Sequence, residues 1–280
     1  MKFITGADGV YLAESDMAVN LTSLAPEIGH DLMAVISGHI SLDDCAALAK
    51  QGEAVAIESI TPALPVARPG KFICLGLNYL DHIKEGGNKV PDYPVLFMRG
   101  QTSLVASGQP MILPRASEQL DYEAELLVVI GKTGKHLTPE TALDHVFGYG
   151  LFNDGSVRNF QYRTHQWTGG KNFDSTGAIG HIIVTADEIP DGGKGRSIQS
   201  RINGEVMQDS NTDLMMWSVA NTLASISEFA TLEAGDLIAM GTPPGVGHAR
   251  TPPRFLKDGD HVEVEIEGIG ILSNPVQAES

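Results

Sequence analysis

The segment LDYEAELLVVIGK, residues 120–132, constrains the fold more than any other part of the chain. Its run of Leu, Val and Ile ends at Gly131 and is typical of a buried β-strand. Side chains alternate along a strand, so we expect Asp121, Glu123 and Glu125 to point to the same side. Three carboxylates in such proximity repel one another and do not suit an apolar core. The pattern therefore predicts that a positive group lies among them.

The rest of the chain after the first quarter contains short apolar runs separated by Gly and Pro, and HVEVEIEG (residues 261–268) alternates strictly. Only two longer helical patterns interrupt these strands. TPETALDHVFG has Thr138 as N-cap and Pro139 at the first helical position, and DLMMWSVANTLASISEFATLEAG is expected to end near Gly235. Regular strand–helix alternation is missing, so we predict a β-dominated α+β fold rather than a doubly wound one.

The beginning of the chain has a different texture and predicts a small N-terminal α/β unit over residues 1–65. The stretch SLDDCAALAK predicts a short helix, with Ser41 as N-cap and Asp44 in the capping-box position. The stretch TPALPVARPG, residues 61–70, contains three prolines and predicts a stiff, extended connection. We therefore expect the catalytic domain to span residues 66–280.

Composition excludes several classes of partner. The chain has 19 basic and 35 acidic residues, a net charge of −16, which argues against binding to nucleic acid or to an anionic membrane. No apolar run approaches the roughly 20 residues that cross a bilayer. The N-terminal MKFITGADGV lacks the apolar stretch of a signal peptide, and Cys45 and Cys74 are expected to be free thiols. These features predict a cytoplasmic location.

Oxygen ligands for a metal come from two segments. Asp154 follows an apolar run in GYGLFNDGSVRNFQ, and the turn-forming Asn-Asp-Gly predicts that it lies at a strand end. Together with Glu123 and Glu125 it makes a sulfur-free set that suits Mg²⁺, Mn²⁺ or Ca²⁺ rather than zinc. From spacing alone, an exposed acidic edge with a turn aspartate explains the same residues equally well.

The stretch GLNYLDHIKEGG predicts a short helix that Asn78 caps and the paired glycines end. His82 and Glu85 are three residues apart, so their side chains are neighbours on that helix. A carboxylate beside an imidazole orients it and makes it a better base. The alternative is an ordinary ion pair on a solvated helix surface.

Two glycine-rich stretches remain. In QWTGGKNFDSTGAIG, two glycines precede Lys171, which could neutralise an anion or be a solvated loop lysine. MGTPPGVG, residues 240–247, lacks the Lys-Ser/Thr of a phosphate-binding loop, so we exclude nucleotide binding and expect at most a rigid loop that offers amides to a carboxylate. No G-x-S-x-G motif supports a serine hydrolase.

Taken together, these stretches resemble the fumarylacetoacetate hydrolase (FAH) family over about Lys71 to Val276. The similarity also covers NGEVMQDSNT and GDHVEVEIEGIGILSNPV, and the motifs occur in the family's order. The resemblance implies an FAH-like roll of layered mixed β-sheet with few helices, and a homodimer. It also implies that the N-terminal unit is an accessory domain.

The resemblance implies roles for individual residues. It assigns metal binding to Glu123, Glu125 and Asp154, water activation on a mobile lid to His82 and Glu85, charge stabilisation to Lys171, and substrate contacts to Arg99, Thr242 and Gln161. Two positions depart from the family pattern: Leu77 stands where an Arg is frequent, and Arg99 where a Lys is frequent. Both departures concern the choice of substrate and leave the metal ligands intact.

The implied activity is metal-dependent hydrolysis of a C–C bond in an acylpyruvate, such as fumarylpyruvate or maleylpyruvate. In that reaction His82 would deprotonate a water, and the products would be pyruvate and a carboxylic acid. The expected cofactor is Mg²⁺ or Mn²⁺, and the expected ligand is a small 2-oxo acid. An oxaloacetate decarboxylase, a 2-hydroxydienoate isomerase and a non-catalytic metal-binding scaffold remain open as alternatives.

Overall fold

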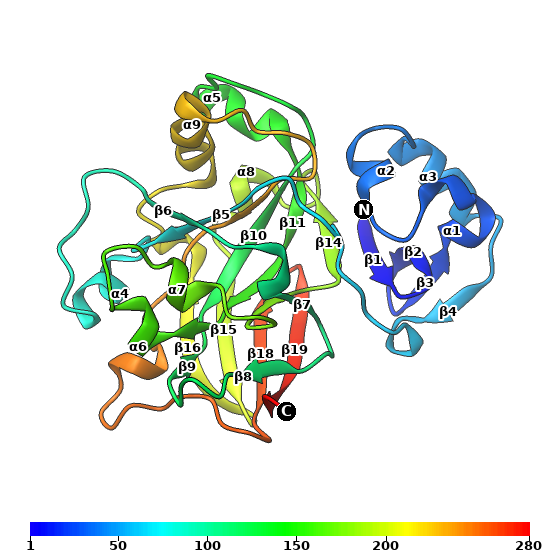
Figure 1. Ribbon diagram of the computed structural model, residues 1–280. Helices are drawn as coiled ribbons and strands as arrows, with labels where there is room; N and C mark the ends of the chain where they lie inside the picture. The colour runs from blue at the N-terminus through cyan, green and yellow to red at the C-terminus, as the bar shows by residue number, and fades with distance from the viewer.

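A twelve-stranded mixed sheet is the largest element of this computed structural model, which describes residues 1–280 (Figure 1). Its main path runs β4-β3-β2-β1-β14-β11-β10-β17-β5-β6, and β13 and β7 branch from β11. The strands of this sheet that follow residue 70 are β5 (Phe72–Gly76), β6 (Val95–Met98), β7 (Leu104–Ala106), β10 (Ala124–Ile130), β11 (Val146–Asp154), β13 (Gly177–Ile179), β14 (Ile182–Thr185) and β17 (Leu237–Ala239). Most neighbouring strands are antiparallel, and β17–β5 and β13–β7 are the parallel pairs.

Strand β10 lies at the centre of the molecule, and every residue in it is buried. Leu126 and Val128 belong to one buried cluster, whereas Leu127 and Val129 belong to the other. Because side chains alternate along a strand, the two clusters cover opposite faces of the sheet. This explains why the sequence of β10 is continuously apolar once the acids end.

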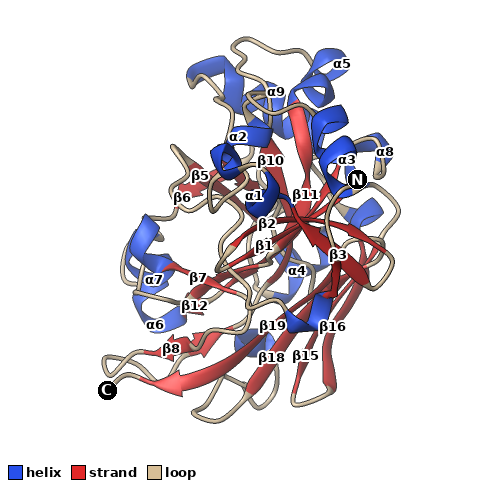
Figure 2. Ribbon diagram, turned by 90° about the vertical axis from the view of Figure 1, so that its right-hand side faces the viewer, coloured by secondary structure: helices blue, strands red, loops and turns tan.

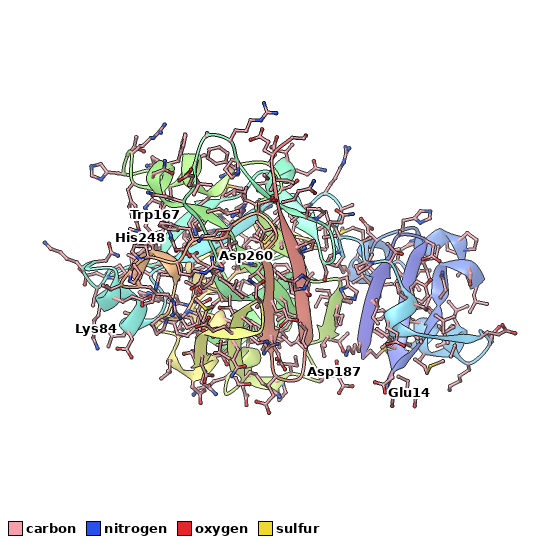
Figure 3. The ribbon with its side chains drawn as sticks, turned by 90° about the horizontal axis from the view of Figure 1, so that it is seen from below. Glu14, Lys84, Trp167, Asp187, His248 and Asp260 are labelled. Carbon is pink, nitrogen blue, oxygen red and sulfur yellow. The ribbon has the colours of Figure 1, made fainter.

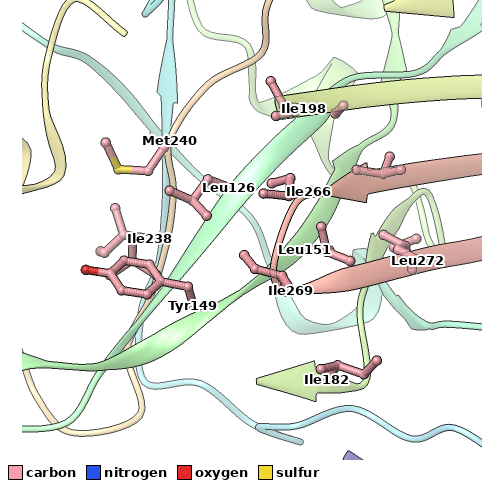
Figure 4. Close-up of a cluster of buried hydrophobic side chains, with 14 of the residues drawn as sticks. Leu126, Tyr149, Leu151, Ile182, Ile198, Ile238, Met240, Ile266, Ile269 and Leu272 are labelled. Atoms are coloured by element: carbon pink, nitrogen blue, oxygen red, sulfur yellow. The ribbon is translucent and has the colours of Figure 1, made fainter. Parts of the chain in front are cut away.

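A second sheet of five strands packs against one face of the first, with the order β16-β15-β18-β19-β8. Its strands are β8 (Met111–Leu113), β15 (Ser197–Ile202), β16 (Glu205–Asn211), β18 (His261–Ile266) and β19 (Gly270–Ala278), and a separate pair is formed by β9 (Leu120–Asp121) and β12 (Ser156–Val157). The alternation expected for β18 is confirmed by its burial pattern. Figure 4 shows Leu126 and Leu151 of the large sheet facing Ile198, Ile266 and Leu272 of the small one.

The N-terminal part contributes its own strands and helices but shares the large sheet (Figure 1). It contains β1 (Lys2–Gly6), β2 (Gly9–Glu14), β3 (Met17–Asn20), β4 (Ala54–Ala56), α1 (Leu21–Leu24), α2 (Met33–Ile36) and α3 (Leu42–Ala49). Strand β1 pairs with β14, so Phe3 lies opposite Ile183. The predicted capping box of α3 is confirmed, since Asp44 and Ser41 bond each other's backbone amides. The division at residue 65 stays a prediction, because one sheet crosses it.

Few helices accompany the sheets, as the β-dominated α+β prediction requires. The remaining helices are α4 (Leu80–Glu85), α5 (Pro139–Ala142), α6 (Arg158–Gln161), α7 (Thr168–Lys171), α8 (Pro190–Gly193) and α9 (Val219–Phe229). The 3₁₀ turns are η1 (Pro26–Ile28), η2 (Ile57–Ser59), η3 (Gln101–Ser103), η4 (Leu143–His145), η5 (Thr212–Leu214) and η6 (Gly247–Ala249). Helices α5 and α9 lie together at one end of the molecule, and α6 and α7 lie together elsewhere (Figure 2).

The two helical patterns of the sequence give different outcomes. Helix α5 begins with the predicted cap at Thr138 and Pro139. Helix α9 is shorter than predicted: it begins after Ser218, whose side chain caps Asn221, and it ends at Phe229 rather than near Gly235. The preceding residues cannot join the helix because Trp217 forms backbone hydrogen bonds to a distant asparagine side chain.

Both cysteines are buried and unpaired, which confirms the prediction of free thiols. No helix of this structure combines the length and apolar character needed to cross a membrane.

Candidate active site

Glu123, Glu125 and Asp154 form a buried acid cluster at the ends of β10 and β11. Each offers one carboxylate oxygen within 4.8 Å of those of the others. Asp154 is the last residue of β11, as predicted. The predicted continuous strand is wrong in one detail: pairing is interrupted after Asp121, and Glu123 lies between β9 and β10. There the backbone amide of Glu123 donates to Asn153 Oδ1 instead.

Three cations lie among these acids, as the opening argument requires: Lys171, Arg158 and Arg99. Lys171 Nζ is 2.6 Å from Glu123 Oε2 and 2.6 Å from Asp154 Oδ2, and it comes from α7 after its two glycines. Arg158 NH2 is 2.7 Å from Glu123 Oε1, and Arg158 Nε is 2.8 Å from Asp121 Oδ2. Asp121 is therefore bound by arginine and does not belong to the acid cluster.

Arg99 does not have the predicted substrate contact. Its side chain is fully buried and does not line the cavity described below. The guanidinium bonds Asp154, the Gly155 carbonyl and the hydroxyls of Ser103 and Thr176. Arg99 is instead a partner that fixes one carboxylate oxygen of Asp154.

The pKa values follow from burial and from these ion pairs. Burial raises the pKa of Glu123, but the charges of Lys171 and Arg158 outweigh it and bring the pKa to about 2. Burial also lowers the pKa of Lys171, but the carboxylates of Asp154 and Glu123 reverse this and raise it, so Lys171 stays charged. Burial and the charges of Asp154 and Glu123 raise the pKa of Glu125 well above its usual range.

Glu125 is the acid of the cluster that has the fewest partners within the protein. Its Oε2 accepts a 2.9 Å hydrogen bond from Gly241 N, and it has no cationic partner. Around this cluster the buried ionisable groups are four carboxyl groups and three cations, a net charge of 3 − 4 = −1 once Glu125 is ionised: Asp121, Glu123, Glu125, Asp154, Arg99, Arg158 and Lys171. A divalent cation coordinated by oxygen ligands suits this excess, and the acid cluster contains no sulfur or nitrogen ligand. The residues therefore fit Mg²⁺ or Mn²⁺.

Helix α4, which the resemblance implies to be a lid, carries the predicted pair. His82 Nδ1 is 2.8 Å from Glu85 Oε1, and their side chains are 13 % and 22 % exposed. The expected cap is wrong: Asn78 does not cap α4, and its amide instead bonds the Trp217 and Met240 backbones. The side chain of Ile83 is buried and anchors the helix to the body of the protein.

The loop of residues 240–248 does offer backbone amides to carboxylates, and the carboxylates are the protein's own. Gly241 N donates to Glu125, and Gly245 N donates to Glu85 Oε2 at 2.9 Å. Further along, the amides of Gly247 and His248 donate to Asp121. Gly245 has φ +104°, and a Cβ there would lie 2.4 Å from Met207 O, so only glycine suits this position.

Several of these groups line one cavity of about 380 Å³, whereas Asp154 and Glu85 lie behind its lining. The predicted residues that line it are His82, Glu123, Glu125, Gln161, Lys171 and Thr242. Trp167 and His248, which also line it, lie on the same side of the molecule as Lys84 of helix α4 and on the side opposite Glu14 of the N-terminal part (Figure 3). The cavity is therefore remote from the N-terminal strands β2 and β3.

Arg158 is a site residue that the sequence analysis missed, as is Arg163, which also lines the cavity. Arg158 is 3 % exposed and also donates to Gln161 Oε1 at 2.8 Å, so it links the acids to a cavity-lining amide. Its position in the sequence indicated a place near the acids, because Arg158 stands four residues after Asp154 in the stretch GYGLFNDGSVRNFQ. A single arginine in a turn-rich segment does not by itself reveal a buried partner.

Layered mixed sheets surround a cavity that carboxylates, a lysine and a histidine line, which is the arrangement of an enzyme active site. The chain belongs to the fumarylacetoacetate hydrolase family: the model described as fumarylacetoacetate (FAA) hydrolase C-terminal matches residues 71–277. This confirms the family resemblance and its predicted extent.

Relatives of known name include the rat oxaloacetate tautomerase Fahd2a, mitochondrial, which is 42% identical over 231 residues, covering 82% of this chain and 74% of the relative. Among solved structures, a fumarylacetoacetate hydrolase from psychrophilic Exiguobacterium antarcticum has a TM-score of 0.87 and 37% identity, with 100% of both chains covered. A maleylpyruvate hydrolase from Sphingobium sp. SYK-6, in complex with manganese (II) ion and pyruvate, has a TM-score of 0.83 and 24% identity over 100% of both chains. The last likeness concerns the fold alone.

Proposed function

We propose that the protein catalyses the keto–enol interconversion of a 2-oxo dicarboxylate of the oxaloacetate type, with Mg²⁺ or Mn²⁺ as cofactor. The observation that carries this proposal is the pair of His82 and Glu85, 2.8 Å apart, in the lid beside the cavity that Glu123 and Glu125 line. Tautomerisation needs a base that removes a proton from carbon and returns it to oxygen. One oriented imidazole supplies such a base, and no attacking water is required.

Glu123, Glu125 and Asp154 would hold the cation. A bound Mg²⁺ or Mn²⁺ supplies a Lewis acid that polarises the 2-oxo group of the substrate. Lys171 remains charged beside Glu123 and Asp154, so it stabilises negative charge that develops on a substrate oxygen nearby.

His82 would move the proton. Glu85 accepts the hydrogen bond from Nδ1, so Nδ1 carries the hydrogen and Nε2 keeps the lone pair that acts as base. Nε2 takes a proton from the carbon next to the keto group and returns it to the enol oxygen. The Glu85 carboxylate stabilises the imidazolium that exists between the two steps.

Arg163 supports a substrate with a second carboxylate. It lines the same cavity, its guanidinium lies 3.5 Å from the centre of the Phe160 ring, and it has no acidic partner. An unpaired arginine at a cavity is suited to a carboxylate. The name of the 42% identical rat relative, an oxaloacetate tautomerase, supports a four-carbon substrate of this kind.

Hydrolysis of an acylpyruvate, the activity expected from the sequence, is the second candidate. His82 keeps 13 % of its side-chain surface accessible, so water can reach the base. The 37% identical structure from Exiguobacterium antarcticum bears the name of a hydrolase, which supports this candidate. Both reactions would use the same cation and the same imidazole.

The test follows the enol form of oxaloacetate by its ultraviolet absorption, with Mg²⁺, with Mn²⁺ and with EDTA. We expect the metal-loaded protein to accelerate the loss of enol and EDTA to abolish the effect. In parallel, pyruvate release is measured from a panel of acylpyruvates and from oxaloacetate. Release of pyruvate from an acylpyruvate, with no effect on the enol, would replace the tautomerase proposal with the hydrolase.

A further inference from the structure

Gln208 lies outside the cavity but connects its two sides. It belongs to β16, is 1 % exposed, and stands in the NGEVMQDSNT motif. Its Oε1 accepts hydrogen bonds from Ala124 N at 3.0 Å and from Ser200 Oγ at 2.8 Å. Its Nε2 donates to Thr242 Oγ1 and to Pro243 O, both at 2.8 Å.

These partners fix the orientation of the Gln208 amide. Ala124 N can only donate and Pro243 O can only accept. Exchanging the oxygen and nitrogen of Gln208 would therefore place its NH₂ group against the Ala124 N–H and its oxygen against the Pro243 oxygen. Nε2 must face the loop of residues 240–248, and Oε1 must face Ala124, which lies between Glu123 and Glu125.

This orientation determines what the Thr242 hydroxyl can do. Oγ1 already accepts a hydrogen bond from Gln208, so it has its own hydrogen left to donate. Thr242 is 3 % exposed, makes no other side-chain hydrogen bond within the protein, and lines the cavity. Its hydrogen is therefore available to an acceptor in the cavity.

We propose that Gln208 is a positioning residue that holds Thr242 as a hydrogen-bond donor to the carboxylate of a bound 2-oxo acid. The proposal rests on the proposed function only for the kind of ligand. Because Gln208 also binds the Ala124 amide, it sets the separation between the segment that contains Glu123 and Glu125 and the loop that carries Thr242. The site would then favour an acceptor, such as a carboxylate oxygen, over an amide or ammonium group at this position.

The experiment measures binding of oxalate to the Mg²⁺-loaded protein by calorimetry. Oxalate has the carboxylate of a 2-oxo acid but no reacting carbon, so its binding can be read even if the protein lacks tautomerase activity. Gln208→Met keeps the length of the side chain and removes its polar atoms. We expect about tenfold weaker oxalate binding, the effect of one hydrogen bond to a charged group, while Mg²⁺ affinity changes by less than about threefold.

A double-mutant cycle separates positioning from general destabilisation. In a Thr242→Val background, Gln208→Met should weaken oxalate binding no further. In a Thr242→Ser background, which keeps a hydroxyl, it should again weaken binding about tenfold. Gln199→Met on the neighbouring strand, where Gln199 bonds Asp209 away from the cavity, is the matched control and should leave oxalate affinity unchanged.

Equal losses from Gln208→Met in the valine and serine backgrounds would overturn the proposal, and so would unchanged oxalate affinity in the single variant. Should Gln208→Met not fold, Gln208→Glu replaces it: the carboxylate keeps an acceptor for Ala124 and Ser200 and loses the donor for Thr242. The same tenfold loss is then expected, and retained affinity would contradict the proposal. Oxalate binding by a wild-type protein with no effect on enol oxaloacetate would refute the proposed function alone.

Discussion

The two halves of the active site are held in different ways. Each of two acids in the acid cluster, Glu123 and Asp154, bonds cations through both of its carboxylate oxygens, and all of these groups are buried. The lid helix α4 is only six residues long, and its Glu85 reaches the rest of the protein through the amide of Gly245. The half with the acid cluster, which we propose to bind the metal, is therefore preorganised by buried ion pairs, whereas the half with the proposed base depends on a few partly exposed contacts.

Within the preorganised half, replacing Glu125 should abolish turnover with the smallest effect on stability. Glu125→Gln removes a charge from the proposed cation site and leaves no cation unpaired, because its only protein donor is Gly241 N. We expect metal-dependent turnover to be abolished and the metal-free protein to be as stable as the wild type. Thermal denaturation in EDTA checks the second point, and undiminished turnover in Glu125→Gln would remove this residue from the site.

Asp154→Ala should give the same loss of turnover and, in addition, a loss of stability. It leaves Arg99 buried without an acidic partner and Lys171 with Glu123 alone, and breaking a buried ion pair costs about 3–5 kcal/mol. Chemical denaturation of the metal-free variants measures the difference. Equal stability of the Asp154 and Glu125 variants would mean that the ion pairs do not hold this half in place.

His82→Ala tests the other half of the site. We expect it to lower the rate of enol interconversion by about 10²–10⁴, the usual contribution of an acid–base group. Binding of Mg²⁺ and of oxalate should persist, because the acid cluster is held independently of α4. Calorimetry provides the control. A simultaneous loss of Mg²⁺ binding would show that the two halves are not separate.

Glu85→Gln should have a smaller effect than His82→Ala. The amide still accepts from Gly245 N but no longer stabilises a charged imidazole, so we expect a rate loss of about 10–100-fold. Glu85→Ala removes the contact with Gly245 as well and should increase hydrogen exchange of the lid residues 80–88. If hydrogen exchange of these residues does not change in Glu85→Ala, the contact with Gly245 does not stabilise the lid and Ile83 alone holds it.

Arg163→Gln should have the smallest effect. Arg163 is exposed and bonds no acid, so its contribution to binding is screened by water. We expect the KM for oxaloacetate to rise about three- to tenfold, with oxalate affinity unchanged, because oxalate is too short to extend beyond the metal. A parallel loss of oxalate affinity would place Arg163 nearer the acid cluster than proposed.

The acids and the pair on the lid could be predicted from the sequence because strand alternation and helical spacing are local properties. Glu123 and Glu125 are two residues apart, and His82 and Glu85 are three apart. Their partners could not be predicted in this way. The residues around Lys171 show only a lysine after glycines; the family resemblance implied its role in the site, and nothing local indicated that it would lie between two carboxylates.

Errors of prediction have the same cause. Asparagine is a common helix-capping residue, but the side-chain amide of Asn78 instead donates hydrogen bonds to the backbone carbonyls of residues 217 and 240. Arg99 matches a substrate-contacting position of the family, yet it is drawn into the protein by Asp154. In both cases a partner from a distant segment determines the side-chain position, and a single sequence does not contain that pairing.

The loop of residues 240–248 has a consequence for how the chain acquires its activity. Its amides bind Glu125, Asp121 and Glu85 across sequence separations of 116, 126 and 160 residues. During synthesis, the acids of β10 therefore emerge well before their amide donors. Contacts between such distant segments form slowly, because long loops must close first. A nascent or truncated chain that ends before Gly241 would carry the acids without the groups that position them, so the site should be among the last parts of the protein to mature.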